Sequence, residues 1–175
     1  MKSKYYINPV LIEIRPSKML PGEIGLFAAC ALKKGTIIGD ATLLGERFIP
    51  WSEYTKNDTR TKKKINQYCL QTIDGFYAPS DFNYMSVPWN MNHCCNYNVG
   101  FDKKGNFVTV RQIKSGEELT WDYGMGISNP KFKLVCACKA KKCRNLITGN
   151  DWKNSKYLHK NKEYFMRELL KAAKI

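Results

Sequence analysis

Three cysteines gather late in the chain at a spacing that suits a metal ion. Cys136 and Cys138 are separated by one residue, and Cys143 follows after four more. Thiolates this close can share one soft ion, and zinc held by four protein ligands is the usual structural case. Three ligands leave a tetrahedral site incomplete, so a fourth must come from elsewhere. The segment 92–96 offers two thiols and an imidazole as candidates.

A second segment with chemical potential covers residues 117–124. It combines three acidic residues, Trp121, Tyr123 and a final glycine, and it follows a predicted β-hairpin. The same composition fits an ordinary strand end whose aromatic side chains lie in a core. Taken alone, this segment identifies no reaction.

Four motifs occur in a fixed order along the chain. They are Gly-Glu-Ile-Gly-Leu-Phe-Ala at 22–28, Asn-His-Cys-Cys-Asn-Tyr-Asn at 92–98, Glu-Leu-Thr-Trp-Asp-Tyr-Gly at 118–124, and Cys-x-Cys-x4-Cys at 136–143. Together they resemble the SET-domain methyltransferases that carry a post-SET zinc motif. The resemblance covers about residues 8–150, and four motifs in the family's order make it specific.

The resemblance implies a mainly β fold of several small sheets. In that fold the strand ending at 118–123 and the segment 92–98 cross in a pseudoknot, a rare exception to unthreaded topology. The implied division is a SET domain at 8–130, a post-SET zinc segment at 131–150 and a C-terminal basic helical extension at 151–175.

Matching the motifs residue by residue implies a site for S-adenosylmethionine. Glu23, Ile24 and Gly25 match the backbone that approaches this cofactor. Asn92 and His93 match the positions that hold its methionine part. Cofactor and substrate are then expected to enter from opposite faces and to meet in a narrow channel.

The resemblance also implies the catalytic residues. Tyr123 matches the active-site tyrosine beside the transferring methyl group. We take Tyr68 as the second active-site tyrosine and as a cofactor contact, with Tyr77 as the alternative. Trp121 stands in the substrate channel, where the family usually has the tyrosine or phenylalanine that tunes how many methyl groups are added. The number of methyl groups added therefore stays open.

Cys95 matches the family's fourth zinc ligand, which completes one structural zinc site with the late trio. By joining the core to the late cysteines, the metal would bring the post-SET segment over the active site. Ile147 or Trp152 would then cover the adenine. Asn145 replaces the glycine that usually follows Cys-Arg, a change expected to affect this cover rather than the zinc.

The implied activity is methyl transfer to the ε-amine of a protein lysine, on a histone or another basic protein presented as an extended segment. A protonated lysine has a pKa of about 10.4 and no lone pair, so it must lose a proton before it attacks. A desolvating aromatic channel and a positive sulfonium both favour the neutral amine. The reaction therefore needs positioning at near-attack distance more than a strong base.

Local patterns predict the elements that must hold these residues. Short strands are expected at 10–14, 36–38 and 68–73, and a hairpin is expected between 99–101 and 107–110. Residues 50–64 are polar and predict a surface helix or an inserted loop. Leu158, Phe165, Leu169 and Ala172 share one helical stripe, which predicts an amphipathic helix of about four turns that packs on its own domain.

Composition limits the class of protein. The 175 residues suit one domain, and no stretch of about 18 apolar residues predicts a membrane span. An odd count of 7 cysteines argues against a disulfide framework and for an intracellular protein, cytoplasmic or nuclear, including a host nucleus if it is an effector. We expect Cys30 and Cys69 to be small buried hydrophobic residues.

The charge is unevenly distributed. The whole chain carries +14, and the segment from Lys131 onward has 13 basic and 3 acidic residues. This tail fits contact with nucleic acid or a nucleosome, and it fits a solvated lysine-rich surface equally well. Two alternatives follow: a non-catalytic zinc module that binds nucleic acid, or a SET fold that binds the cofactor without turnover.

Overall fold

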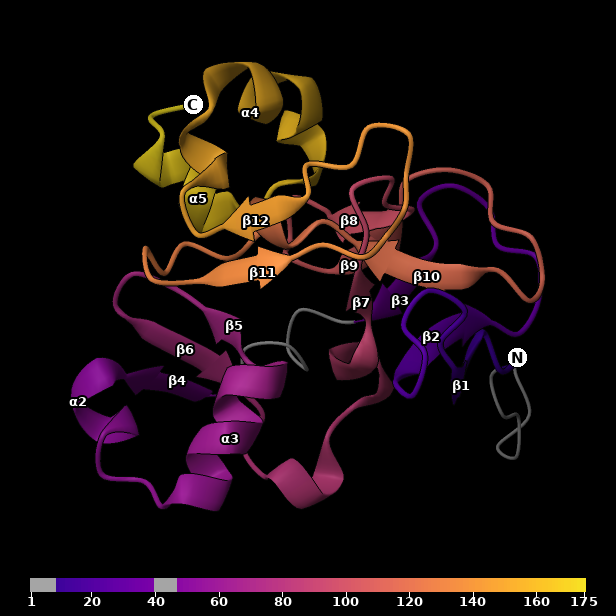
Figure 1. The fold of residues 1–175 in the computed structure, drawn as a ribbon. Helices are drawn as coiled ribbons and strands as arrows, with labels where there is room; N and C mark the ends of the chain where they lie inside the picture. Colours follow the sequence, from indigo (N-terminus) through magenta and orange to yellow (C-terminus); the bar gives the residue numbers. More distant parts are fainter. Residues whose placement is uncertain (1–8, 40–46) are drawn as a thin grey trace, which may run out of the picture.

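The computed structural model describes residues 9–39 and 47–175 as small β-sheets with helical segments at two places (Figure 1). The strands are β1 (Ile12–Pro16), β2 (Ile24–Ala28), β3 (Ile37–Gly39), β4 (Arg47–Pro50), β5 (Leu70–Gln71), β6 (Gly75–Ala78), β7 (Asn92–His93), β8 (Val99–Phe101), β9 (Phe107–Thr109), β10 (Glu118–Trp121), β11 (Lys133–Val135) and β12 (Leu146–Thr148). The helices are α2 (Trp51–Tyr54), α3 (Thr59–Tyr68), α4 (Ser155–Asn161) and α5 (Arg167–Ala172), with single 3-10 turns between them. Residue 8, where the SET domain was expected to begin, lies outside the described residues.

The largest sheet brings together segments that are far apart in sequence. Its order is β1-β2-β10-β8-β9-β3, with β7 also paired to β10. Strand β2, which lies between β1 and β10, is buried along Leu26, Phe27 and Ala28, which is typical of a strand covered on both faces. The predicted hairpin is confirmed, because β8 and β9 pair antiparallel across the turn at 102–106.

The two segments that were expected to cross lie side by side around β10. Thr120 lies opposite Asn92, and Trp121 lies opposite both His93 and Val99, in parallel pairing. The backbone N–H of Cys94 donates to the Trp121 carbonyl at 3.1 Å. The motifs at 92–98 and 118–124 are therefore held side by side by main-chain hydrogen bonds.

A separate three-stranded sheet, β4-β6-β5, carries α2 and α3 (Figure 1, lower left). The polar stretch predicted as a helix or loop forms α3, because the Asp58 carboxylate caps its start by accepting from the N–H of Arg60 and Thr61. Ile65 is the one buried residue of this helix. The strand predicted at 68–73 is shorter than expected, since Tyr68 is the last residue of α3 and only Leu70–Gln71 pair.

The C-terminal segment is helical and packs on its own domain, but the prediction of one continuous four-turn helix is wrong. Helices α4 and α5 are separated by a 3-10 turn and by extended backbone at Phe165 and Met166. The break occurs because the Met166 N–H donates to the Met125 carbonyl at 2.9 Å instead of to a carbonyl of its own helical segment. Leu158, Phe165 and Leu169 still bury one common apolar face around Met125.

Strands β11 and β12 form a short antiparallel ribbon between the large sheet and the C-terminal helices. A close approach fixes this region from the other side: a Cβ atom on Gly100 of β8 would lie 2.5 Å from Tyr164 Cβ, so only glycine lets the C-terminal segment pack there. Among the helices that the structure describes, none has the length and apolar character needed to cross a bilayer.

Candidate functional site

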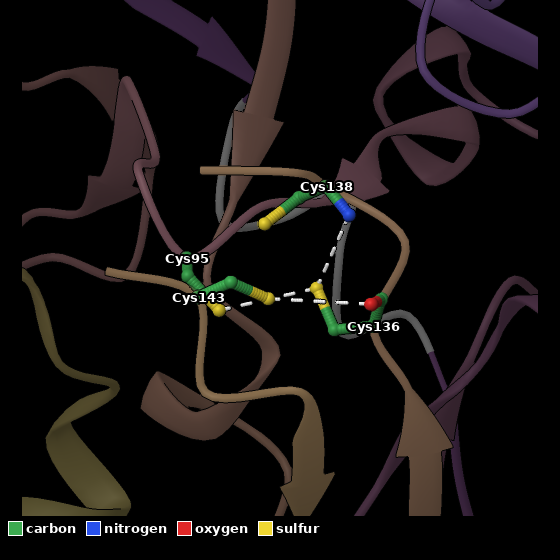
Figure 2. Close-up of side chains that lie close together, drawn as sticks. All are labelled: Cys95, Cys136, Cys138 and Cys143. Atoms are coloured by element: carbon green, nitrogen blue, oxygen red, sulfur yellow. Dashed lines mark hydrogen bonds between the residues drawn. The ribbon is translucent and has the colours of Figure 1, made fainter. Parts of the chain in front are cut away.

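Four cysteine side chains converge in one cluster (Figure 2). The sulfur atoms of Cys95, Cys136, Cys138 and Cys143 all lie within 4.8 Å of one another. Cys95 comes from the turn after β7, whereas the other three come from the loop between β11 and β12. The fold therefore joins one early and three late residues in a single cluster.

Backbone N–H groups face these sulfurs, as they do around metal-bound thiolates. The N–H of Arg144 donates to Cys95 Sγ at 3.4 Å, and that of Asn145 donates to Cys143 Sγ at 3.3 Å. Asn145 has a φ of 62°, in the left-handed region that asparagine tolerates better than most residues. The replacement of the family's glycine at this position is thus compatible with the backbone that the loop needs.

The donor set fits a zinc ion. Burial raises the pKa of the Cys95 thiol to about 11, so a divalent cation is the natural means of holding it as a thiolate. Burial opposes ionisation of Cys138 as well, but hydrogen bonds from the backbone N–H groups of Ala140 and Cys95 lower its pKa to about 6. Four thiolates leave no open coordination position, so the cluster could hold one structural zinc.

Tyr123, two residues after the end of β10, is connected to the segment around the Asn-His motif by two hydrogen bonds. Its hydroxyl donates to the Met91 carbonyl at 3.1 Å, and its backbone N–H donates to His93 Nδ1 at 3.1 Å. Because Nδ1 accepts, the neutral imidazole carries its proton on Nε2, which lies 3.4 Å from Cys95 Sγ. Burial lowers the pKa of His93 to about 4 and raises that of Tyr123 to about 12, so both groups are neutral at pH 7.

A cavity of about 230 Å³ opens beside Tyr123. Its wall includes Tyr68 from the end of α3, Tyr77 from β6, and Trp121 from β10. Both tyrosines considered from the sequence thus line the same cavity as Tyr123. Because aromatic and aliphatic side chains dominate the wall, the cavity offers a desolvated environment to an entering group.

The large ring of Trp121 is accommodated by its neighbours. It packs against Tyr123 with ring centroids 4.8 Å apart and against Phe101 and Phe107 at 5.5 Å each. A Cβ atom on Gly126 would lie 2.9 Å from this ring, so glycine is needed there. Trp121 is only 7% exposed and keeps one face in the cavity wall.

Most of the residues matched to cofactor binding form a second group outside this cavity, namely Glu23, Ile24, Gly25, Asn92 and His93, whereas Tyr68 lines the cavity. Asn92 Nδ2 donates to the Ile24 carbonyl at 2.8 Å, which brings the first and second motifs together. Glu23 is exposed and Ile24 is 43% exposed, whereas Gly25 is buried against the Glu118 carboxylate. An accessible backbone edge beside a side-chain amide fits a ligand with a polar, charged end.

Glu118 organises the turn that precedes β2. Its carboxylate accepts from Ser17 Oγ at 2.8 Å and from the Lys18 N–H at 2.9 Å. A Cβ atom on Gly25 would lie 2.5 Å from Glu118 Oε1, so the first motif requires glycine at this point. The sequence motif at 118–124 therefore contributes to both groups of residues.

An ion-pair network that sequence reasoning missed connects the cysteine cluster to Tyr123. Arg144 Nη1 and Nη2 each lie 2.6 Å from an Asp122 oxygen, and Arg144 Nε lies 3.2 Å from Asp151 Oδ2. Asp122 is fully buried and directly precedes Tyr123. An aspartate placed between two aromatic residues of a buried strand was the available signal, because such a carboxylate requires a cationic partner.

The residues considered as a cover for the adenine lie near this network. Ile147 pairs with Leu134 across the β11–β12 ribbon and has no exposed surface. Trp152 is half-buried and donates through Nε1 to the Gly149 carbonyl at 3.0 Å. Cys69, by contrast, is buried with Ile65 and Phe76, as expected for a small hydrophobic residue.

Comparison with known proteins supports the motif assignment. The SET-domain family model matches residues 23–124, more than half of the chain. Histone-lysine N-methyltransferase ash1 of Drosophila melanogaster is 31% identical over 96 residues, which is 48% of this chain and 4% of that protein. Histone-lysine N-methyltransferase 2B of Homo sapiens is 26% identical over 154 residues, 79% of this chain and 6% of that protein.

A third relative, histone-lysine N-methyltransferase set1 of Dictyostelium discoideum, is 38% identical over 64 residues, which is 33% of this chain and 4% of that protein. The chain thus spans only a small part of the length of each of these relatives. Its matched region contains the parallel pairing of β7 with β10, Tyr123 and most of the residues that line the cavity beside it. From the family match and this geometry, the chain belongs to the SET-domain family.

Proposed function

We propose that this chain transfers a methyl group from S-adenosylmethionine to the ε-amine of a lysine in a histone or another basic protein. The observation that carries the proposal is the hydrogen bond from the Tyr123 hydroxyl to the Met91 carbonyl. This bond lies at the wall of an aromatic cavity and one residue from Asn92. The names of the curated relatives, which are histone-lysine methyltransferases, support the same reaction class.

In this proposal the two groups of residues divide the work between two faces. Glu23, Ile24, Gly25, Asn92 and His93 hold the cofactor, and Tyr68 and Ile147 contact it from the α3 side and from the post-SET ribbon. Bound S-adenosylmethionine supplies an electrophilic methyl group on a positively charged sulfonium. The cavity takes the target lysine.

The cavity wall makes the lysine reactive by removing water. Its aromatic side chains make the charged ammonium unfavourable. The lysine therefore loses its proton to solvent and occupies the cavity as the neutral amine. The Tyr123 hydroxyl and the Met91 carbonyl then orient the amine, and Tyr68 restricts its path. No residue needs to act as a strong base.

The cysteine cluster has a structural role in this proposal. A zinc ion on Cys95, Cys136, Cys138 and Cys143 ties the post-SET segment to the turn after β7. We propose the SET domain at 8–130, the post-SET segment at 131–150 and the basic extension at 151–175. If the substrate is a histone in a nucleus, the lysine-rich extension would contact the nucleosomal DNA beside it. The other possibility to test is a basic protein substrate in the cytoplasm.

The test is radiolabelled methyl transfer from S-adenosylmethionine onto core histones, reconstituted nucleosomes and a whole-cell extract. Tyr123→Phe removes the hydroxyl that contacts Met91 and is expected to abolish labelling. Tyr84→Phe is the matched control, because Tyr84 is 85% exposed and the same hydroxyl deletion there should leave labelling intact.

Each outcome separates one alternative. Cofactor binding by calorimetry without transfer to any substrate would identify a SET fold that has lost turnover. No cofactor binding by zinc-loaded protein, together with salt-sensitive binding of nucleic acid, would replace the proposal with a non-catalytic module. Label on lysine in the wild type and in Tyr84→Phe, but not in Tyr123→Phe, is the expected result.

A further inference from the structure

The cavity beside Tyr123 has charged side chains at only two places in the described part of its wall. Lys104 reaches it from the turn between β8 and β9, and Glu168 reaches it from α5. Every other lining residue is apolar, aromatic, an amide, a thiol or a glycine. Glu168 also lies outside the region 23–124 that matches the family. The shared SET motifs therefore give no account of this carboxylate.

The break between α4 and α5 brings Glu168 to the cavity. Extended backbone at Phe165 and Met166 ends one helical segment, and the hydrogen bond from the Met166 N–H to the Met125 carbonyl holds the chain there. Met166 itself lines the cavity. Leu169, one residue beyond Glu168, is only 5% exposed and anchors α5 in the apolar cluster around Met125. Glu168 is thus exposed but mounted between two fixed positions.

The Glu168 carboxylate has no ion-pair partner among the described residues, although the chain has 29 basic and 15 acidic residues. Five other described carboxylates are paired with arginine or lysine: Glu13 with Arg15, Glu53 with Lys56, Glu117 with Arg111, and Asp122 and Asp151 with Arg144. Among the described carboxylates without an ion pair, only Glu168 lines this cavity. An unpaired carboxylate at the edge of a low-dielectric cavity attracts cations.

The field of this carboxylate extends along the cavity wall. The pKa of Tyr77 is raised first by burial and then by the negative charges of Glu168 and Asp74. Tyr77 lies on β6, so the effect reaches the side of the cavity opposite the C-terminal helices. A cationic group that enters the cavity beside Tyr77 is therefore attracted by the Glu168 carboxylate.

We propose that Glu168 is a specificity-determining residue, which selects substrates with a second cationic side chain next to the target lysine. This inference rests on the proposed lysine methyl transfer. The target amine itself is a poor partner for Glu168, because a carboxylate held against it would stabilise the protonated form that cannot attack. A neighbouring arginine or lysine has no such conflict, since it stays charged throughout the reaction.

The test uses a peptide array in which one lysine is fixed and each flanking position carries Arg, Gln or Glu in turn. Wild type is expected to methylate the best Arg-flanked peptide about five-fold faster, in kcat/KM, than its Gln-flanked counterpart. Glu168→Gln should reduce that ratio to about one, and Glu168→Lys should reverse it in favour of the Glu-flanked peptide. A reversal of preference cannot arise from a purely structural role in the first turn of α5.

Glu163→Gln is the matched control. Glu163 also is an exposed acidic residue in a helical first turn of the C-terminal segment, but it does not line this cavity. Its substitution should leave the Arg-over-Gln ratio unchanged. A wild-type ratio near one, or a ratio that survives Glu168→Gln, would overturn the inference while leaving methyl transfer itself intact. Absence of transfer to every peptide and protein by the wild type would instead overturn the proposed function and this inference with it.

Discussion

Replacing Arg144 with alanine should destabilise the protein far more than an ordinary surface substitution. The Arg144 guanidinium makes two 2.6 Å hydrogen bonds to Asp122, whose side chain is 1% exposed. Removing one member of a buried ion pair leaves the other charge without compensation and costs about 3–5 kcal/mol. The Arg144 side chain is 27% exposed, and water that enters beside Asp122 would reduce the loss.

We therefore expect the low end of that range, about 3 kcal/mol, which corresponds to a fall in Tm of about 6–12 °C for a chain of this size. Differential scanning calorimetry at a fixed zinc concentration measures it. Methyl transfer should fall as well, because Asp122 directly precedes Tyr123 and accepts from the Gly124 N–H at 3.0 Å. Cofactor affinity measured in parallel separates a loss of the active-site geometry from a loss of binding.

Arg111→Ala provides the comparison. Arg111 also pairs with a carboxylate, that of Glu117, but its side chain is 47% exposed. Exposed pairs contribute about 0–1 kcal/mol, so this variant should shift Tm by no more than about 4 °C. Equal Tm values for Arg144→Ala and Arg111→Ala would refute the reasoning, since they would mean that Asp122 tolerates the loss of its partner.

Three further predictions concern zinc, product and pH. Cys138→Ser should lower the amount of bound zinc, measured by atomic absorption, and abolish methyl transfer. Cys30→Ser is the control and should still bind one equivalent of zinc. An unchanged zinc content in Cys138→Ser would show that the cysteine cluster is not the zinc site. Trp121→Phe should enlarge the cavity and increase the number of methyl groups per lysine in mass spectra, and an identical product distribution would contradict a narrowing role for this ring. Since burial raises the pKa of Tyr123 to about 12, its hydroxyl stays protonated, and the rate should rise between about pH 7 and pH 10 as the substrate lysine deprotonates. A rate that falls with pH within that range would count against this assignment.

The motifs alone predicted the family, the class of fold and the four cysteines. That was feasible because each motif combines residue types that seldom occur together by chance. Cys136, Cys138 and Cys143 are close in sequence, and Asn92 and Tyr123 stand in short patterns with a fixed order. The hairpin across 102–106 was also predictable, because its two β-branched and aromatic runs are adjacent in the chain.

Predictions failed where local propensity competed with tertiary contacts. The apolar stripe from Leu158 to Ala172 has helical spacing, yet the chain leaves the helix at Phe165 and Met166. A main-chain hydrogen bond to Met125 and burial of Phe165 outweigh the small free energy of continuing the helix. Tyr68 likewise ends α3 instead of opening a strand, because Asp58 caps a helix whose last turn reaches it.

The sequence by itself determined which groups can do chemistry: thiols for a metal, a tyrosine hydroxyl, and an Asn-His pair. Only the tertiary structure revealed contacts that no motif predicted, such as that of Arg144 with Asp122, which join positions many residues apart. The same holds for Glu168, whose position beside Tyr77 and Trp121 depends on the break in the C-terminal helix. A one-dimensional pattern carries no information on such pairings, since they are fixed by the packing of the whole core.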